Sequence, residues 1–524
     1  MSVGKQYESD LELHGKILKG VKTLADNVAS TLGPRGRNVI LCKKGQRPIV
    51  TKDGVTVAKF VEFDDPFENV GAQIIKQAAA KTNLEAGDGT TTSTVLAKAI
   101  LEKAQKYLTA DAAPIELKRG IDKAVAKIVE NLEEMSTPIS SEEDVAHIAT
   151  ISANGDKTIG KLIATAVDLA GKDGSITIEE ARSIETSLDV VEGFRFDSGY
   201  LASAFITDDK RGVVRYEDPL ILVTDEKIET VDEMMPALEL ISRETRPAII
   251  VADNIEGQAL AALIMNAVRG TLRIAAVKAP RYGEERRNTL KDLALSVGAV
   301  FVTRADNLRL KDVKLSDFGT AKTFECSKNE TIIAGGRGKL KDIEKRIEAL
   351  KVELEQTEDI YECEKIQERI TRLASGVAII RVGAATEIEM IEKKHRIEDA
   401  LGAVKAAQQE GIVPGGGVAL IRASKELNIE VDNEDQELGV KIVLEAIKEP
   451  LKQMAINAGD SPDLILSTVE SQQGSLGVDF VSGEEIDMLK QGVIDPVKVT
   501  RCALQNAASV ASILITTNHA IIEV

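Results

Sequence analysis

The sequence GDGTTTS at residues 87–93 comes directly before a segment with helical patterning. The N-terminus of a helix presents unpaired N–H groups and the positive end of the helix dipole, and both favour phosphate. Glycines let the backbone approach phosphate oxygens closely, and Asp88 can hold a hard cation such as Mg2+ against them. Threonine and aspartate are also common helix caps, but one capping residue would be enough. The cluster therefore predicts a phosphate-binding site, with a plain N-cap as the alternative.

Four other short segments have residue types that could act on a nucleotide, although each one alone is a weak signal. TLGPRGRN at 31–38 and the Lys-Asp-Gly sequence at 52–54 are typical of structural turns. The three consecutive glycines in GIVPGGGV at 411–418 permit close backbone approach by a ligand, or form a hinge. Glu398 and Asp399 lie in a helical segment, where acidic side chains are usually solvated.

The segments that must position these residues are mainly helical at both ends of the chain. Residues 10–134 contain long runs with apolar residues three and four apart, interrupted by a short β section near 38–54. Residues 418–524 have the same helical character. Similar ends around a different middle predict an insertion, with one discontinuous domain built from both ends.

The middle of the chain alternates between β-rich and helical runs over residues 219–303. This alternation predicts βαβ units and a parallel sheet. None of the strand–helix turns has a GxGxxG or GxxxxGK[ST] sequence, so we do not expect the nucleotide site there. Residues 339–374 have two apolar stripes at helical spacing and predict a solvated helical hairpin that turns at 356–359.

The helical segment 256–269 is apolar all round between Ala259 and Met265. One face must pack on the predicted sheet. The other is either buried as well or forms an exposed apolar patch, and such patches mark interaction sites. The preceding helix has a similar excess of apolar residues around Met234 and Met235.

Composition excludes several classes of protein. There are 66 Lys and Arg against 84 Asp and Glu, a net charge of −18, which disfavours nucleic-acid binding. No apolar stretch is long enough to cross a membrane, and the N-terminal residues do not have the apolar core of a signal peptide. The four cysteines and four histidines are scattered, so neither a zinc site nor a disulfide framework is predicted, and a reducing compartment fits best.

Eight motifs occur together and in order, and jointly they are far more specific than any one of them. They are TLGPRGRN (31–38), TKDGVTVAK (51–59), AGDGTTTSTVLA (86–97), LKRGID (117–122), VGAATEIEM (382–390), EDALGAVKAA (398–407), GIVPGGGVALIRA (411–423) and ASVASILITT (508–517). With them the chain resembles the group I chaperonins, the GroEL family, nearly from end to end.

The resemblance implies a multidomain chaperonin fold with three domains. A mainly α-helical equatorial domain would comprise 1–134 and 411–524. A small α/β intermediate domain would comprise 135–192 and 377–410. An α/β apical domain would comprise 193–376.

The resemblance also implies an ATPase site that uses ATP, Mg2+ and K+. The residues implied to contact the nucleotide are Thr31, Leu32, Gly33, Pro34, Lys52, Asp88, Gly89, Thr90, Thr91, Thr92, Gly416 and Asp495. Asp88 would hold Mg2+, and the backbone of Thr31 and Lys52 would lie near K+. Asp53 would help to position the attacking water, and Asp399 would act on that water when the intermediate domain closes.

A polypeptide-binding face is implied for the apical domain. Its residues would be Tyr200, Ala202, Ala204, Phe205, Met235, Leu238, Leu260, Ile264, Met265 and Asn266. Some positions depart from the family pattern. Ala204 stands where an aromatic residue is usual, residues 479–481 replace Asn-Ala-Ala beside the adenine, and the C-terminal NHAIIEV is not the usual Gly/Met-rich tail. Ser198 replaces an arginine that pairs between subunits with the acid matching Glu387.

The function expected from the resemblance is ATP-driven folding of non-native polypeptides in an enclosed cavity. The resemblance implies a homo-oligomer of heptameric rings stacked in pairs, located in the cytoplasm. Its implied partners are non-native polypeptides and a GroES-type co-chaperonin. Rings would stack through pairs matching Lys106 with Glu434 and Lys452 with position 461, where Ser461 replaces the acid. Two alternatives are a divergent paralogue that acts as a scaffold with impaired ATPase cycling, and a metabolic nucleotide-binding enzyme. The βαβ region has no GxGxxG or GxxxxGK[ST] motif, and this disfavours a metabolic nucleotide-binding enzyme.

Overall fold

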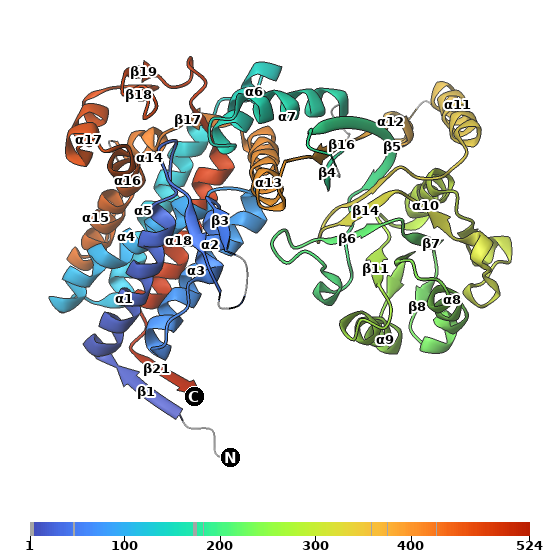
Figure 1. The fold of residues 1–524 in the computed structure, drawn as a ribbon, viewed down its shortest axis with the longest axis horizontal. Helices are drawn as coiled ribbons and strands as arrows, with labels where there is room; N and C mark the ends of the chain where they lie inside the picture. Colours follow the sequence, from blue (N-terminus) through green and yellow to red (C-terminus); the bar gives the residue numbers. More distant parts are fainter. Residues whose placement is uncertain are drawn as a thin grey trace. The chain divides into compact units, whose positions relative to one another are not determined.

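The computed structural model forms two compact units, shown in Figure 1. The first, here called the terminal unit, comprises residues 1–165 and 383–524, and the second, the inserted unit, comprises 166–382. The structure describes residues 5–523 except 44, 46, 47, 171–174, 182, 358, 375 and 426. The division into three domains remains a prediction, and two of its boundaries, after residues 192 and 376, fall within single strands.

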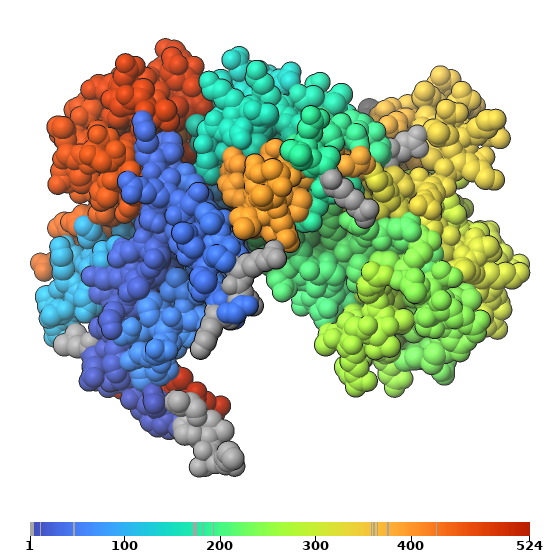
Figure 2. Space-filling view, in the orientation of Figure 1, coloured from blue at the N-terminus to red at the C-terminus, as the bar shows by residue number. Residues whose placement is uncertain are grey.

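Long helices form the core of the terminal unit. In α1 the five apolar residues that recur at helical spacing, from Leu13 to Val28, are all buried, as the pattern predicts. Helices from the two ends of the chain pack together in one core, and Figure 2 shows the N-terminal and C-terminal segments side by side. These core helices are α1 (Asp10–Ala29), α3 (Pro66–Ala86), α4 (Thr90–Thr109), α5 (Pro114–Glu134), α15 (Glu434–Ala446) and α18 (Val497–Ile515).

Shorter elements complete the terminal unit. The further helices are α2 (Gly54–Phe60), α6 (Glu142–Ser152), α7 (Lys157–Ala170), which continues into the inserted unit, α13 (Glu387–Glu410), α14 (Val418–Ala423), α16 (Glu449–Ala458) and α17 (Pro462–Ser471). Four antiparallel pairs of strands are β1 (Lys5–Ser9) with β21 (His519–Glu523), β2 (Val39–Leu41) with β3 (Ile49–Thr51), β17 (Ile412–Pro414) with β20 (Ile494–Pro496), and β18 (Leu476–Val478) with β19 (Glu485–Asp487).

A parallel sheet lies at the centre of the inserted unit, as the alternating pattern predicts. Its strands run in the order β11-β9-β7-β12, and β13 joins β7 in the antiparallel sense. The three longer strands are almost wholly buried, as in sheets covered on both faces. The strands and connecting helices are β7 (Leu220–Thr224), α8 (Val231–Arg243), β9 (Ala248–Ala252), α9 (Gly257–Val268), β11 (Ile274–Lys278), α10 (Gly283–Val297), β12 (Phe301–Val302) and β13 (Gly319–Thr320).

A second, six-stranded sheet lies in the same unit, with the order β4-β16-β5-β15-β14-β6. Its long strand β5 pairs with both β16 and β15, so it continues across the predicted boundary between the intermediate and apical domains. The six strands are β4 (Ser175–Glu180), β5 (Ser187–Phe196), β6 (Val214–Glu217), β14 (Thr323–Cys326), β15 (Thr331–Ala334) and β16 (Gly376–Val382). The short elements β8 (Lys227–Ile228), β10 (Asn254–Ile255), η1 (Ser203–Phe205), η2 (Arg304–Asp306), η3 (Leu310–Asp312) and η4 (Leu315–Asp317) complete the unit.

The predicted helical hairpin is formed by α11 (Leu340–Gln356) and α12 (Ile360–Ala374), while Glu358 in its turn lies outside the described residues. The hairpin is solvated on one side only. Ile343, Leu350 and Ile370 on its apolar stripes pack into the core of the inserted unit. Arg369 on α12 donates two hydrogen bonds to the buried carboxylate of Asp292 on α10, at 2.8 and 3.1 Å. Among the described residues, no helix is long and apolar enough to cross a membrane.

Candidate nucleotide site

A cavity of about 730 Å3 lies within the terminal unit. All five segments singled out in the sequence contribute to its wall. The predicted nucleotide and catalytic residues found there are Thr31, Leu32, Gly33, Pro34, Lys52, Asp53, Asp88, Gly89, Thr90, Thr91, Thr92, Asp399, Gly416 and Asp495. The fold therefore brings the whole predicted set together, while the role of each residue remains a prediction.

The loop between α3 and α4 (Gly87–Gly89), here called the phosphate loop after its predicted role, has glycines in a left-handed conformation at both ends. Gly87 ends α3 with φ of 74° and Gly89 precedes α4 with φ of 86°, a left-handed backbone that side chains disfavour. The N-cap residue of α4 is Gly89, so no N-cap side chain satisfies the first N–H groups of the helix, contrary to the plain N-cap alternative. The first residues of α4, Thr90–Thr92, line the cavity, and the N-terminus of a helix favours anions.

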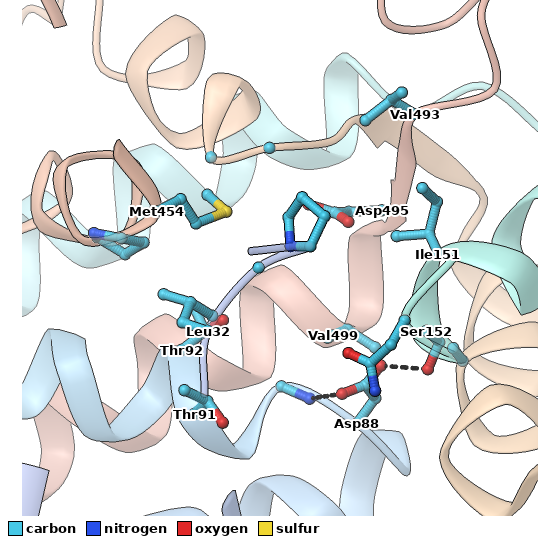
Figure 3. Close-up of a pocket in the computed structure, with 18 of the residues that line it drawn as sticks. Leu32, Asp88, Thr91, Thr92, Ile151, Ser152, Met454, Val493, Asp495 and Val499 are labelled. Carbon is cyan, nitrogen blue, oxygen red and sulfur yellow. Dashed lines mark hydrogen bonds between the residues drawn. The ribbon is translucent and has the colours of Figure 1, made fainter. Parts of the chain in front are cut away.

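Asp88 is held between two donors, as Figure 3 shows. Its Oδ2 accepts a hydrogen bond from the Ser152 hydroxyl at 2.6 Å, and its Oδ1 accepts one from the backbone N–H of Gly89 at 2.5 Å. Desolvation raises the pKa of Asp88, and the two hydrogen bonds oppose that rise. Nearby, desolvation and the charge of Asp88 raise the pKa of Asp495 to about 7.

The desolvated carboxyl groups of Asp88 and Asp495 lie in one cavity, and a divalent cation bound there would stabilise their charged forms. Among the described residues, no group of three or more His, Cys, Asp or Glu side chains could hold a metal ion alone. Mg2+ takes only one or two carboxylates from a protein and completes its shell with phosphate oxygens and water. The donor set around Asp88 therefore fits Mg2+ delivered together with a nucleotide.

Lys52 and Asp53 enter the cavity between β3 and α2. Asp53 caps α2 by accepting hydrogen bonds from the N–H groups of Val55 and Thr56, at 3.2 and 3.1 Å. The Lys52 ammonium donates to the carbonyl of Gly33 at 3.0 Å, and desolvation lowers its pKa. The cap fixes the Asp53 carboxylate at the cavity wall.

The segment 478–481 also lines the cavity, at a place where the sequence departs from the family pattern. Asp479 does not leave its carboxylate free, because it accepts hydrogen bonds from the N–H groups of Val481 and Ser482, at 2.9 and 3.2 Å. Phe480 is buried in a small apolar cluster with Met454. This part of the wall is formed by Val478, Asp479, Phe480 and Val481, and it has no side-chain amide.

Sequence reasoning missed two residues of this site. Ser152, at the end of α6, has no local signal, because it reaches Asp88 from a segment 64 residues away. Arg35 lies within the quoted TLGPRGRN motif but had no assigned role. Its guanidinium donates to the backbone carbonyls of Phe480 and Val481, at 3.4 and 2.8 Å, and so ties that motif to the 478–481 segment.

The predicted polypeptide-binding residues lie in the inserted unit and do not all share one environment. Met235 on α8 is 43% exposed and Met265 on α9 is 47% exposed, while Tyr200, Leu260 and Ile264 are partly buried. Phe205 and Leu238 are buried in the core of the unit, at 2% and 8% exposed. In this structure those two side chains belong to the core beneath the exposed methionines, and their role in binding polypeptides remains a prediction. Here "the α8–α9 apolar surface" means Met235, Leu260, Ile264 and Met265.

Comparison with known families decides the identity of the fold. The sequence model of the TCP-1/cpn60 chaperonin family matches residues 24–524. The chain belongs to that family. The resemblance found in the sequence and the predicted multidomain chaperonin fold are thereby confirmed.

A solved chaperonin has the same fold over nearly the whole chain. It is the chaperonin gp146 from the bacteriophage EL 2 (Pseudomonas aeruginosa), crystallised in the presence of ATP-BeFx. The two chains superimpose with a TM-score of 0.66 at 23% sequence identity, covering 99% of each chain. Membership of this family shows that the protein is a chaperone. Members of the family are known as ATPases and assemble into oligomeric rings.

Proposed function

We propose that this chaperonin is an ATP-driven folding machine that captures non-native polypeptides and encloses them during folding. The observation that carries the proposal is the cavity itself. It unites an uncapped helix N-terminus with glycine on both sides of Asp88, and with two further carboxylates, Asp53 and Asp399. These are the parts that phosphoryl transfer to water requires, namely anion binding, a cation ligand and groups that act on the water.

ATP would bind with its phosphates at the N-terminus of α4 and its adenosine toward Gly416, Asp495 and the 478–481 segment. Mg2+ held by Asp88, together with K+ near Thr31 and Lys52, would neutralise phosphate charge. The protein's own contribution is placement: Asp53 orients the attacking water, and Asp399 on α13 accepts its proton as general base. The structurally similar phage chaperonin gp146 was crystallised in the presence of ATP-BeFx, which supports a nucleotide as the ligand of this cavity.

Client capture would use the α8–α9 apolar surface. Unfolded polypeptides share exposed apolar area rather than sequence, and burying that area is favourable by about 25 cal/mol per Å2. Methionine suits such a surface because its flexible side chain adapts to many partners. Heptameric rings, stacked in pairs and closed by a GroES-type co-chaperonin in the cytoplasm, complete the proposal by analogy with the family.

A scaffold role with impaired ATPase cycling is a second candidate, because Ser198, Ala204 and Asp479 all depart from the family pattern. One experiment separates the two. A denatured client enzyme is diluted into the purified assembly with ATP, without ATP, or with a non-hydrolysable analogue, and both regained activity and phosphate release are measured. Recovery that requires hydrolysable ATP supports the proposal. Client binding without turnover in any condition would favour the scaffold.

A further inference from the structure

Helix α13 and the phosphate loop meet at two glycines. A β-carbon on Gly87 would lie 2.6 Å from the Cα of Gly402, and a β-carbon on Gly402 would lie 2.7 Å from the Cα of Gly87. Real β-carbons essentially never come this close, and backbone atoms cannot rotate away as a flexible side chain can. The two backbones therefore touch only because neither residue has a side chain.

The two glycines are constrained for different reasons. Gly87 has φ of 74°, so its backbone conformation alone favours glycine. Gly402 lies in the interior of α13, where glycine is unfavourable relative to alanine because it gives up more chain entropy. The close backbone contact with Gly87 is therefore the reason in this structure why position 402 needs glycine.

The same turn of α13 carries the predicted catalytic acid. Asp399 precedes Gly402 by three residues, a spacing that places both on one side of a helix. Asp399 and Ala403 line the cavity, while Gly402 touches the residue directly before Asp88. How closely α13 approaches the phosphate loop therefore sets where the Asp399 carboxylate stands relative to Asp88.

We propose that Gly402 is a positioning residue for Asp399. Its missing side chain seats α13 directly on the phosphate loop, so that the carboxylate reaches the water that attacks the phosphate. This inference rests on the proposed ATPase function. A β-carbon at position 402 holds α13 away from the loop and withdraws Asp399, whereas the N–H groups of α4 that bind phosphate stay in place.

The test compares Gly402→Ala with a matched helical glycine. Gly402→Ala should slow single-turnover ATP hydrolysis by about 10- to 100-fold, since small misplacements of a catalytic group have effects of this size. Its Kd for ATP should stay within about twofold of the parent, and the variant should stay folded at the assay temperature, because the better helix propensity of alanine offsets part of the cost of displacing α13. Gly15→Ala in α1 is the control, because no described atom lies within 4 Å of the added β-carbon, and its turnover should be unchanged.

A rescue experiment separates positioning from damage to the fold. Asp399→Glu lengthens the side chain by one methylene and should slow hydrolysis in the parent. Combined with Gly402→Ala it should restore part of the lost rate, because the longer side chain spans the added distance. Gly402→Ser adds the same β-carbon with a different helix propensity and should behave like Gly402→Ala.

The outcomes are distinct. A parent that neither binds nor hydrolyses ATP would refute the proposed function and this inference with it. An active parent together with an equally active Gly402→Ala variant would refute the inference alone. Equal loss of ATP affinity and rate, or unfolding of both the alanine and serine variants, would also overturn it, because the contact would then shape the binding loop or the fold.

Discussion

The Ser152 hydroxyl donates a hydrogen bond of 2.6 Å to the Asp88 carboxylate, so the end of α6 is bonded directly to the proposed cation ligand. This bond opposes the rise in the pKa of Asp88 that desolvation causes. Without it, Asp88 would hold its proton to higher pH, and a protonated carboxyl cannot bind Mg2+.

We therefore expect Ser152→Ala to weaken Mg-ATP binding roughly three- to tenfold more at pH 6 than at pH 8. Calorimetric titrations across that pH range would measure the effect. Ser152→Thr keeps the hydroxyl and is the control, with a parental pH profile expected. The same loss of affinity at both pH values would show that Ser152 does not act through the ionisation of Asp88.

Asp88 and Asp399 should separate binding from chemistry. Asp88→Ala should abolish the Mg2+ dependence of ATP binding, because the proposed cation ligand is lost. Asp399→Ala should keep affinity within a few fold while turnover falls by about 10²–10⁴, the usual contribution of a general base. Equilibrium binding and phosphate release decide both. Parental turnover in Asp399→Ala would remove this residue from the mechanism, and unchanged affinity in Asp88→Ala would count against the phosphate site.

Asp495 should make the ligand-free protein less stable as pH rises. Its pKa is raised from 3.8 to about 7, mainly by desolvation, so the folded state binds the proton more tightly than the unfolded state. The resulting stability is complete below about pH 4 and is lost as the pH rises through 7. Asp495→Asn should therefore stabilise the ligand-free protein at pH 8 by about 1–4 kcal/mol, with a smaller gain at pH 5.

Thermal unfolding of ligand-free protein between pH 4.5 and 8 measures this dependence. Asp460→Asn removes an exposed carboxylate and is the control, with no comparable gain expected. A stability gain from Asp495→Asn that did not grow with pH would contradict the assignment.

The α8–α9 apolar surface should bind clients, although Leu260 and Ile264 also pack partly against the core of the inserted unit. Leu260→Ser and Ile264→Ser should weaken capture of a denatured client at least tenfold while the subunits stay folded, because both side chains are only partly buried. Val352→Ser, at an equally apolar residue that is 52% exposed on α11, should leave capture unchanged. Leu263→Ser should instead unfold the subunit, because a polar group would enter a fully buried position. Folded Leu260→Ser subunits with parental client binding would exclude this surface.

Stacking of rings should be weak. The Lys452 ammonium lies 2.9 Å from Asp463 of its own chain, so its charge is already paired within the subunit, and Ser461 cannot supply the family's acid. A single exposed pair contributes only about 0–1 kcal/mol, but ring symmetry repeats each loss. We expect double rings that release single heptamers as salt increases, and a tighter interface in Ser461→Glu. Native mass spectrometry across a salt series, with and without ATP, tests this; fourteen-subunit particles under every condition would refute it.

The sequence by itself predicted the long helices, the parallel sheet and most of the candidate residues around the cavity, but not Ser152 or the role of Arg35. Helical spacing identifies the buried face of α1 because neighbouring positions on one helix carry that information. The phosphate loop was predictable because glycine, aspartate and threonine stand together at one helix start. The other cavity residues were predictable only through the joint occurrence of motifs, since each motif alone is typical of a turn.

Only the tertiary structure decided which distant segments meet. Ser152 reaches Asp88 and Gly402 touches Gly87 through the packing of α6 and α13, which no local pattern encodes. Leu238 and Met235 are both apolar residues on α8, and the sequence does not show which of them is buried. The tertiary structure shows that Leu238 is buried and Met235 is exposed. The physical reason is the same throughout: spacing along a chain sets which side chains share a face, but contacts between elements depend on how their backbones fit together.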